Sequence, residues 1–273
     1  MRSDAISLLG TWHDGSESPA GGPSWDAVAA GFLGCGYRVS FPHRPGFEAP
    51  LEHAEGWALR VADTFGARWD ISAWAALRGR LGSGGGWTGV TVVGGWPYGL
   101  DRSFGAPWTR AHTGFVIRTG VRPVRAITLP WARDTESATA ALPLISGLVE
   151  ARASSRLRSR GADVGLWADH HGEVVTGTAG ALLLRLDGGW TTPRADVAAG
   201  ASWPWGALRE ALSAHPARVT PAEVLAAECV AFVSPLGDLE VATALDDRPL
   251  RLDDAPRDEL AALRERLLPG LSR

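Results

Sequence analysis

The chain contains no lysine, and this absence excludes one class of chemistry. All 27 basic residues among its 273 residues are arginine. An arginine guanidinium stays protonated and does not form the imine that a lysine amine forms with a carbonyl compound. The sequence therefore excludes every mechanism that uses an internal lysine Schiff base. The bias itself is typical of a GC-rich genome that replaces Lys by Arg on the protein surface.

Cysteine and tyrosine are also scarce, with two of each. Cys35 and Cys229 are too few for a disulfide framework, and no residues near them have metal-ligand spacing. No apolar run approaches the roughly 18 residues that span a bilayer, and the first residues are too polar for a signal peptide. A formal net charge of -3 argues against nucleic acid or an anionic membrane as the main partner. We therefore expect a cytoplasmic protein whose partner is a small molecule, without a metal site.

The length allows one large or two medium domains. Ser24 is a plausible cap of a first helix, and the segment 119–123 is the best boundary between domains. The order of elements predicts an α+β fold with an N-terminal subdomain 1–118, a linker 119–123 and a C-terminal subdomain 124–273. Further helices are expected over 51–66, 70–82, 141–161, 203–213 and 255–269, with a short one after Thr220. Strands are expected over 87–95, 114–120, 125–131, 164–169, 173–179, 181–186, 229–235 and 239–245.

Three blocks of the second half carry a family pattern: GADVGLWADHHGEVVTGTAGALLLRLDGGWTTP, VAAGASWPWGALREAL and RVTPAEVLAAECVAFVSPLGDLEVATAL. A fainter likeness lies in GFLGCGYRVS and LEHAEGWALRVADTFG. These blocks resemble the class IV aminotransferases, which use pyridoxal phosphate (PLP) on fold type IV and include branched-chain and D-amino acid aminotransferases and 4-amino-4-deoxychorismate lyase. The resemblance covers most of the chain and is more specific in the second half. It implies a two-subdomain fold, and a homodimer because family members are typically homodimers.

At the positions that bind PLP in the family, this chain departs from the pattern. Counting by the family's spacing places Pro143 at the lysine position, and a proline within a chain has no free amine. Thr176 replaces the acidic residue that contacts the pyridine nitrogen, and Gly56 replaces the arginine that holds the phosphate. Gly147 stands where the family has a tyrosine. We therefore predict that the chain uses no cofactor and does not carry out PLP chemistry, and that its cofactor positions are degenerate.

One part of the family site is retained in the sequence. Ser202 is predicted to cap a helix whose first turn contains Trp203 and Pro204. The family uses this turn to present backbone N–H groups to the cofactor phosphate, and a helix start binds anions whatever its side chains are. The alternative is that Ser202 only caps the helix.

A second candidate constellation is Arg110 and His112, which lie on one side of an extended segment. In D-amino acid members of the family an Arg-x-His pair binds the substrate carboxylate, although that pair lies earlier in the domain. The 13 tryptophans include several at loops or turns near the inferred pocket, which suits a flat, apolar or aromatic ligand. Most tryptophans, however, are core or interface residues.

These features lead to three hypotheses of function. The first is a PLP-independent enzyme, a lyase, cyclase or isomerase acting on an aromatic, enolpyruvyl or polyketide-like small molecule in specialised metabolism. The second is a non-catalytic pseudoenzyme that binds a small molecule or partners an active homologue. The third is an aminotransferase or aminodeoxychorismate lyase that holds PLP non-covalently. For the first, the candidate catalytic residues are Tyr37, Arg110, His112 and Thr176, and the candidate ligand-binding residues are Arg38, Thr178, Ser202 and Trp203.

Overall fold

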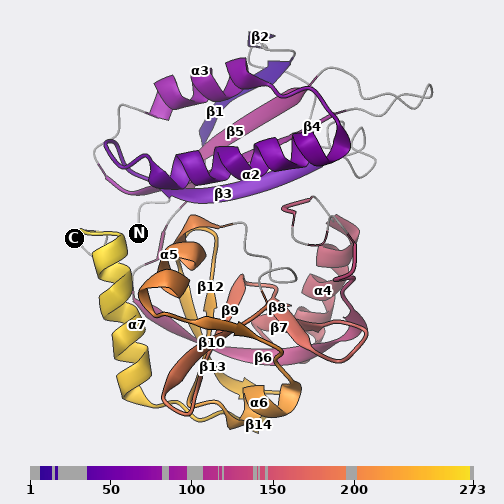
Figure 1. Ribbon diagram of the computed structural model, residues 1–273, viewed down its shortest axis with the longest axis vertical. Coiled ribbons are helices and arrows are strands. Elements are labelled where there is room, and N and C mark those ends of the chain that lie inside the picture. Colours follow the sequence, from indigo (N-terminus) through magenta and orange to yellow (C-terminus); the bar gives the residue numbers. More distant parts are fainter. Residues whose placement is uncertain are drawn as a thin grey trace. The chain divides into compact units, whose positions relative to one another are not determined.

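The computed structural model of the protein divides the chain into two compact units (Figure 1). Unit 1 comprises Met1–Ile117 with Leu142–Ile145, and unit 2 comprises Arg118–Ala141 with Ser146–Arg273. The helix expected after Ser24 lies outside the described residues. The structure describes residues 7–13, 16–17, 36–81, 86–96, 107–115, 117–118, 120–137, 140, 142–144, 147–194 and 202–270.

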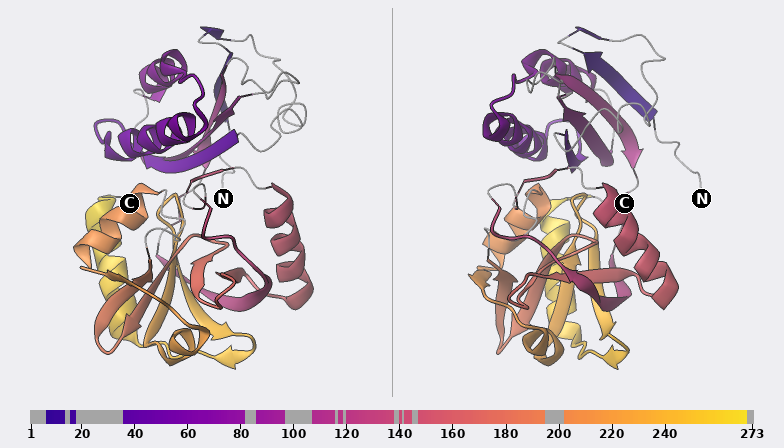
Figure 2. Two further views of the ribbon diagram at one scale, coloured as in Figure 1. Left: turned by 45° about the vertical axis from the view of Figure 1, so that its right-hand side comes forward. Right: turned by 90° about the vertical axis from the view of Figure 1, so that its right-hand side faces the viewer.

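The described part of unit 1 contains an antiparallel sheet with helices α2 and α3 on one face (Figure 2). The strands follow the order β2-β1-β5-β4-β3. Apolar side chains that alternate along the strands pack against the helices, as the period of two in a strand requires. The strands are β1 (Ser7–His13), β2 (Ser16–Glu17), β3 (Gly36–His43), β4 (Thr88–Gly95) and β5 (Trp108–Phe115), and the helices are α2 (Ala49–Phe65) and α3 (Ile71–Leu81).

The helix boundaries in unit 1 follow from local chemistry. Helix α2 ends at Gly66, which adopts the left-handed conformation with φ 61° that glycine tolerates best. Helix α3 begins after Asp70, whose carboxylate accepts a hydrogen bond from the backbone N–H of Ala73 at 3.1 Å. Both boundaries were predicted from the sequence.

Unit 2 is a curled mixed sheet in the order β11-β10-β9-β12-β13-β6-β7-β8, with β14 paired to β13. Strand β8 also contacts β9 and β10, so the sheet folds back on itself around an inner apolar core. Helices α5 and α7 pack on the outer face, and α4 covers β6 and β7. The strands are β6 (Val121–Ala132), β7 (Val164–Ala168), β8 (Val174–Gly177), β9 (Ala181–Leu186), β10 (Gly189–Pro193), β11 (His215–Ala217), β12 (Cys229–Val233), β13 (Leu239–Leu245) and β14 (Arg248–Pro249). The helices are α4 (Gly147–Arg160), α5 (Trp203–Ala211), α6 (Pro221–Ala226) and α7 (Asp254–Leu267).

Together the units form an α+β fold, as predicted. No helix in the described part of the chain is long and apolar enough to cross a membrane.

Three expected segments differ from the structure. Residues 121–123, expected in a linker, begin β6 because they pair in parallel with β13. The strand expected over 114–120 lies earlier, at Trp108–Phe115, where it pairs with both β1 and β4. The helix expected over 141–161 begins only at Gly147, because residues 142–144 are extended and pair with β3. Pro143 supplies no backbone N–H and disfavours the helical conformation of the residue before it.

The turn between β8 and β9 yields a prediction of stability. A Cβ atom added to Gly180, at φ 153°, would lie 2.0 Å from the carbonyl oxygen of Val233. We expect Gly180→Ala to lower the free energy of unfolding by about 3 kcal/mol or more, because backbone of β12 would have to move. Chemical denaturation measures this loss.

Gly188→Ala is the matched control. Gly188 also has a positive φ, 76°, but an added Cβ would meet no atom within 4 Å. We expect a loss of about 1 kcal/mol from the left-handed conformation alone. Equal losses in the two variants would contradict the close approach of the turn to β12.

Candidate functional site

A polar grid occupies one face of the unit 1 sheet. Cross-strand partners in antiparallel strands point to the same face, and alternate residues along each strand share that face. The apolar residues between the grid positions point to the opposite face, where they pack with α2 and α3. The first row of the grid, across β3, β4 and β5, is Arg38, Val93 and Arg110, and the second row is Ser40, Thr91 and His112.

The grid combines positive charge with hydroxyl groups. Arg38 is exposed, whereas Arg110 and His112 are half-buried. The Ser40 and Thr91 hydroxyl oxygens are 2.8 Å apart and hydrogen-bonded, and Thr91 is only 5% exposed. None of the six grid residues is acidic. Two guanidinium groups without a carboxylate among them favour an anionic ligand.

His112 supplies a group that can accept a proton at neutral pH. Burial lowers its pKa below the ordinary value of histidine, and the positive charge of Arg110 lowers the pKa further. The imidazole is therefore neutral near pH 7. A neutral imidazole beside two arginines can take a proton from a bound anionic molecule.

Tyr37 does not belong to this grid, contrary to its expected catalytic role. It precedes Arg38 on β3 and so points to the opposite face of the sheet. Its hydroxyl accepts a hydrogen bond from Nε1 of Trp74 at 3.3 Å. Burial raises the pKa of Tyr37 to about 12. Tyr37 is therefore a core residue of unit 1.

The three positions expected from the resemblance to be degenerate, Pro143, Gly56 and Gly147, lie on backbone features of the structure. The carbonyl of Pro143 accepts a hydrogen bond from the N–H of Arg38 at 2.8 Å, at the edge of the unit 1 sheet. Gly56 is exposed in the middle of α2, and a Cβ added there would meet no atom within 4 Å. Gly147 is the first residue of α4. None of these three residues has a side chain that can bind a phosphate or form an imine.

Thr176 and Thr178 hold the end of β8 together. The Thr176 side chain is fully buried, and its hydroxyl donates to the carbonyl of Gly180 at 3.1 Å. The hydroxyl of Thr178 accepts a hydrogen bond from the N–H of Gly165 at 2.9 Å. Both hydroxyls therefore have structural contacts within unit 2. The hydroxyl of Thr176 thus bonds inward to the protein backbone.

Ser202 and Trp203 lie at the start of α5, at the same end of the unit 2 sheet. The turn that contains Gly180 approaches the end of β12. Gly237 lies in the turn between β12 and β13, and a Cβ added to it would lie 3.6 Å from Pro204 of α5. Ser202 is 4% exposed and makes no capping hydrogen bond with its side chain. Nε1 of Trp205 is buried and has no hydrogen-bond partner among the described residues. The donors at this helix start are therefore the Ser202 hydroxyl and the backbone N–H groups of the first turn, which can bind an anion.

The four candidates from unit 2 thus gather at one end of its sheet, and three from unit 1 gather on the grid. Ser40 and Thr91 were missed in the sequence. Thr91 lies on the strand expected over 87–95, whereas Ser40 lies on β3, which was not expected as a strand; the alternation of Arg38 and Ser40 along β3 was the available signal.

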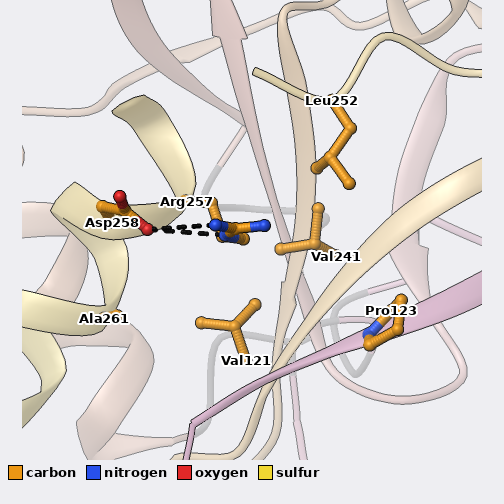
Figure 3. A pocket seen from close by; sticks show the side chains of 7 residues that line it. All are labelled: Val121, Pro123, Val241, Leu252, Arg257, Asp258 and Ala261. Atoms are coloured by element: carbon orange, nitrogen blue, oxygen red, sulfur yellow. Dashed lines mark hydrogen bonds and ion pairs between the residues drawn. The ribbon is translucent and has the colours of Figure 1, made fainter. Parts of the chain in front are cut away.

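A separate cavity of about 410 Å³ lies between α7 and the outer face of β6 and β13. None of the candidate residues lines it. Figure 3 shows the Arg257 side chain between Asp258 and the apolar side chains of β6 and β13. The residues that line this cavity are Val121, Pro123, Val241, Leu252, Arg257, Asp258 and Ala261. Among the residues that the structure describes, no group of three or more His, Cys, Asp or Glu side chains is placed to hold a metal ion.

The fold matches solved structures, whereas no protein-family model and no curated protein matches the sequence. A branched-chain aminotransferase from the archaeon Thermoproteus uzoniensis, solved with norvaline, is 19% identical, with a TM-score of 0.77 over 98% of this chain and 97% of that chain. The fold IV transaminase CpuTA1 from Curtobacterium pusillum is 20% identical, with a TM-score of 0.71 over 92% and 91%. A Legionella pneumophila protein assigned as a 4-amino-4-deoxychorismate lyase is 19% identical, with a TM-score of 0.70 over 86% and 92%. The chain therefore has the class IV aminotransferase fold, fold type IV, as the resemblance implied.

The residues of this chain do not fit PLP held as an internal imine. The chain has no lysine at any position, and it also has no asparagine or glutamine. Pro143 contributes only its carbonyl, and the hydroxyl of Thr176 already donates to the carbonyl of Gly180. These positions do not supply the amine and the carboxylate that such a cofactor site needs.

The contact of Thr176 predicts an effect on stability. Thr176→Val keeps the shape of the side chain but removes the hydrogen bond to the Gly180 carbonyl. We expect a loss of about 1 kcal/mol in the free energy of unfolding, measured by chemical denaturation.

Thr64→Val provides the comparison. Thr64 donates a similar hydrogen bond to the carbonyl of Arg60 at 2.8 Å, but on the exposed surface of α2. We expect almost no loss there, because water replaces the partner. If Thr176→Val is as stable as the wild type, the hydrogen bond from Thr176 to the Gly180 carbonyl does not stabilise the fold.

Proposed function

We propose that this chain is a PLP-independent enzyme that binds an anionic small molecule on the polar grid of unit 1. The observation that carries the proposal is the register that places Arg38, Arg110 and His112 on one face of the sheet. Because the chain has no lysine, a mechanism that forms an imine with a lysine side chain is excluded. The fold is that of aminotransferases, but a fold does not by itself determine a reaction.

The roles of the residues follow from their charges. Arg38 and Arg110 bind the carboxylate or other anionic group of the substrate and stabilise negative charge that develops next to it. His112 accepts a proton from a carbon atom near that group and returns it at another atom of the same molecule. Such a transfer suits an isomerase, a cyclase or a lyase, and suits aromatic, enolpyruvyl or polyketide-like substrates whose carbanions are delocalised.

The start of α5 in unit 2 provides a second anion-binding element of the proposed enzyme. Ser202 and the backbone N–H of Trp203 lie at the positive end of the helix dipole. Ser202→Ala tests this element, because it removes a hydroxyl without removing the helix start. From the family resemblance we also propose a homodimer, which light scattering of the purified protein tests directly.

The role of His112 is tested by proton exchange in heavy water. The purified protein is incubated with a panel of aromatic, enolpyruvyl and β-keto acids, and NMR detects deuterium that enters carbon positions. We expect exchange in at least one compound, and a fall of about 100-fold or more in His112→Ala, because the general base is lost.

His53→Ala is the matched control. His53 is also a half-buried histidine of unit 1 whose pKa is lowered by burial and then by Arg60, but its Nε2 accepts a hydrogen bond from Trp57 at 3.0 Å. Exchange that is equal in wild type and His112→Ala would refute the proposed function. Binding without any exchange would support the pseudoenzyme instead, and exchange that requires added PLP would support non-covalent PLP.

The same proposal predicts a pH profile. Because the pKa of His112 is lowered, its neutral and active form persists to a lower pH than the neutral form of an ordinary histidine. We expect kcat/KM to fall only when the pH drops below the lowered pKa of His112. Arg110→Met removes a neighbouring positive charge and so raises the pKa of His112. We expect the acidic limb of the kcat/KM profile to move to higher pH.

Arg60→Met serves as the control for this profile, because Arg60 lowers the pKa of His53 and not that of His112. Its profile should coincide with that of the wild type. An acidic limb that stays in place in Arg110→Met would show that His112 is not the titrating base.

A further inference from the structure

The cavity between α7 and the outer face of β6 and β13 has an apolar floor. Val121 and Pro123 share this face with Val241, because Pro123 is the cross-strand partner of Val241 and Val121 lies two residues earlier on β6. Leu252, which precedes α7, and Ala261 of α7 complete the floor. The volume of about 410 Å³ lies in the range of pockets that hold small organic molecules. The cavity therefore has room for the apolar part of such a molecule.

The start of β6 leaves part of this floor uncovered. Strand β7 pairs with β6 only from Ala126 onward, so the first residues of β6 pair with β13 alone among the described strands. A proline at such a position is typical of an edge that takes no further strand, because it has no N–H to donate. Pro123 is exposed and Val121 is only half-buried. Helix α7 thus lies beside an apolar surface that it does not fill.

The wall of the cavity that α7 forms carries charges of both signs. Nη2 of Arg257 lies 3.0 Å from a carboxylate oxygen of Asp254 and 3.4 Å from one of Asp258. Figure 3 shows the guanidinium of Arg257 between Asp258 and the apolar side chains of β6 and β13. Both carboxylates are largely exposed, and ion pairs between exposed groups contribute little to stability. A ligand can therefore take up contacts with Arg257 and Asp258 at small cost to the fold.

The opposite charges on one wall select the class of ligand. The carboxylate of a simple apolar acid would approach Arg257 but would also approach the two aspartates, which repel it. The ammonium group of a simple apolar amine would approach Asp258 but would also approach Arg257, which repels it. An α-amino acid carries both groups on one carbon atom, so its carboxylate can pair with Arg257 while its ammonium group pairs with Asp258.

We infer that this cavity binds an apolar α-amino acid whose side chain covers Val121, Pro123 and Val241. The volume favours a large side chain such as that of phenylalanine, which buries more apolar area than a small aliphatic one. The site lies within unit 2 and shares no residue with the grid or with the start of α5. The inference therefore does not depend on the proposed function, and either can fail without the other.

The test is an NMR titration of the full chain labelled with ¹⁵N, with three compounds that share a phenyl group. Phenylalanine has both charged groups, 3-phenylpropionate only the carboxylate, and 2-phenylethylamine only the ammonium group. Because the grid can also bind an aromatic acid, the affinity is read from the amide signals of Val121, Val241 and Ala261. We expect phenylalanine to bind at least about tenfold more tightly than either analogue. Signals that phenylalanine does not shift, or an analogue that binds equally well, would overturn the inference.

Charge variants test the two contacts separately. Arg257→Met should weaken the binding of phenylalanine about tenfold and strengthen that of 2-phenylethylamine, because the repelling charge is gone. Asp258→Asn should weaken the binding of phenylalanine and strengthen that of 3-phenylpropionate. Arg251→Met is the matched control, since Arg251 pairs with Asp253 at 2.8 Å but does not line the cavity. An affinity for phenylalanine that is unchanged in Arg257→Met, or equally reduced in Arg251→Met, would overturn the inference.

A variant that fills the cavity keeps the question open to test if a charge variant does not fold. Ala261→Phe retains both charges but places a large side chain over the apolar floor. We expect it to abolish the binding of phenylalanine, measured by the same titration. Binding in Ala261→Phe with the affinity of the wild type would overturn the inference.

Discussion

The cross-strand register of β3, β4 and β5 decides which side chains of unit 1 meet. Gly36 pairs with Gly95 and Gly95 with Trp108, and from this end the three strands run without a break through Arg38 and Arg110 to His112. A shift of one residue would turn the basic and hydroxyl side chains toward α2 and α3, and would expose the apolar ones. The core packing that fixes the sheet thus also fixes which side chains share the grid face.

In unit 2, packing contacts likewise fix the turn between β8 and β9. Gly180 approaches the backbone of β12 so closely that only glycine fits, and Thr176 closes the turn from the other side. The strand–turn–strand frame of β8 and β9 is therefore held by contacts among the protein's own residues. These contacts maintain the fold, and a fold does not by itself determine a reaction.

Much of the fold was predictable because the signals were local. Gly66 and Asp70 terminate and cap helices by chemistry that a few neighbouring residues determine, and Thr220 forms the capping box with Glu223 that its spacing indicates. The grid was only half predictable. Alternation puts Arg110 and His112 on one face, but which residues of other strands join them depends on register, which long-range packing sets. The same alternation excludes Tyr37 as soon as Arg38 is placed on that face.

The segment that contains Pro143 extends the unit 1 sheet beside the grid. The carbonyl of Pro143 accepts the N–H of Arg38, and Leu144 pairs with Tyr37, so this segment lies along the edge of β3. The backbone of Arg38 is held from one side by Pro143 and from the other by β4. A proline suits the first of these contacts, because its carbonyl accepts a hydrogen bond while it has no N–H to satisfy. The segment expected to carry a lysine in the family thus supports the backbone of a charged residue of the grid.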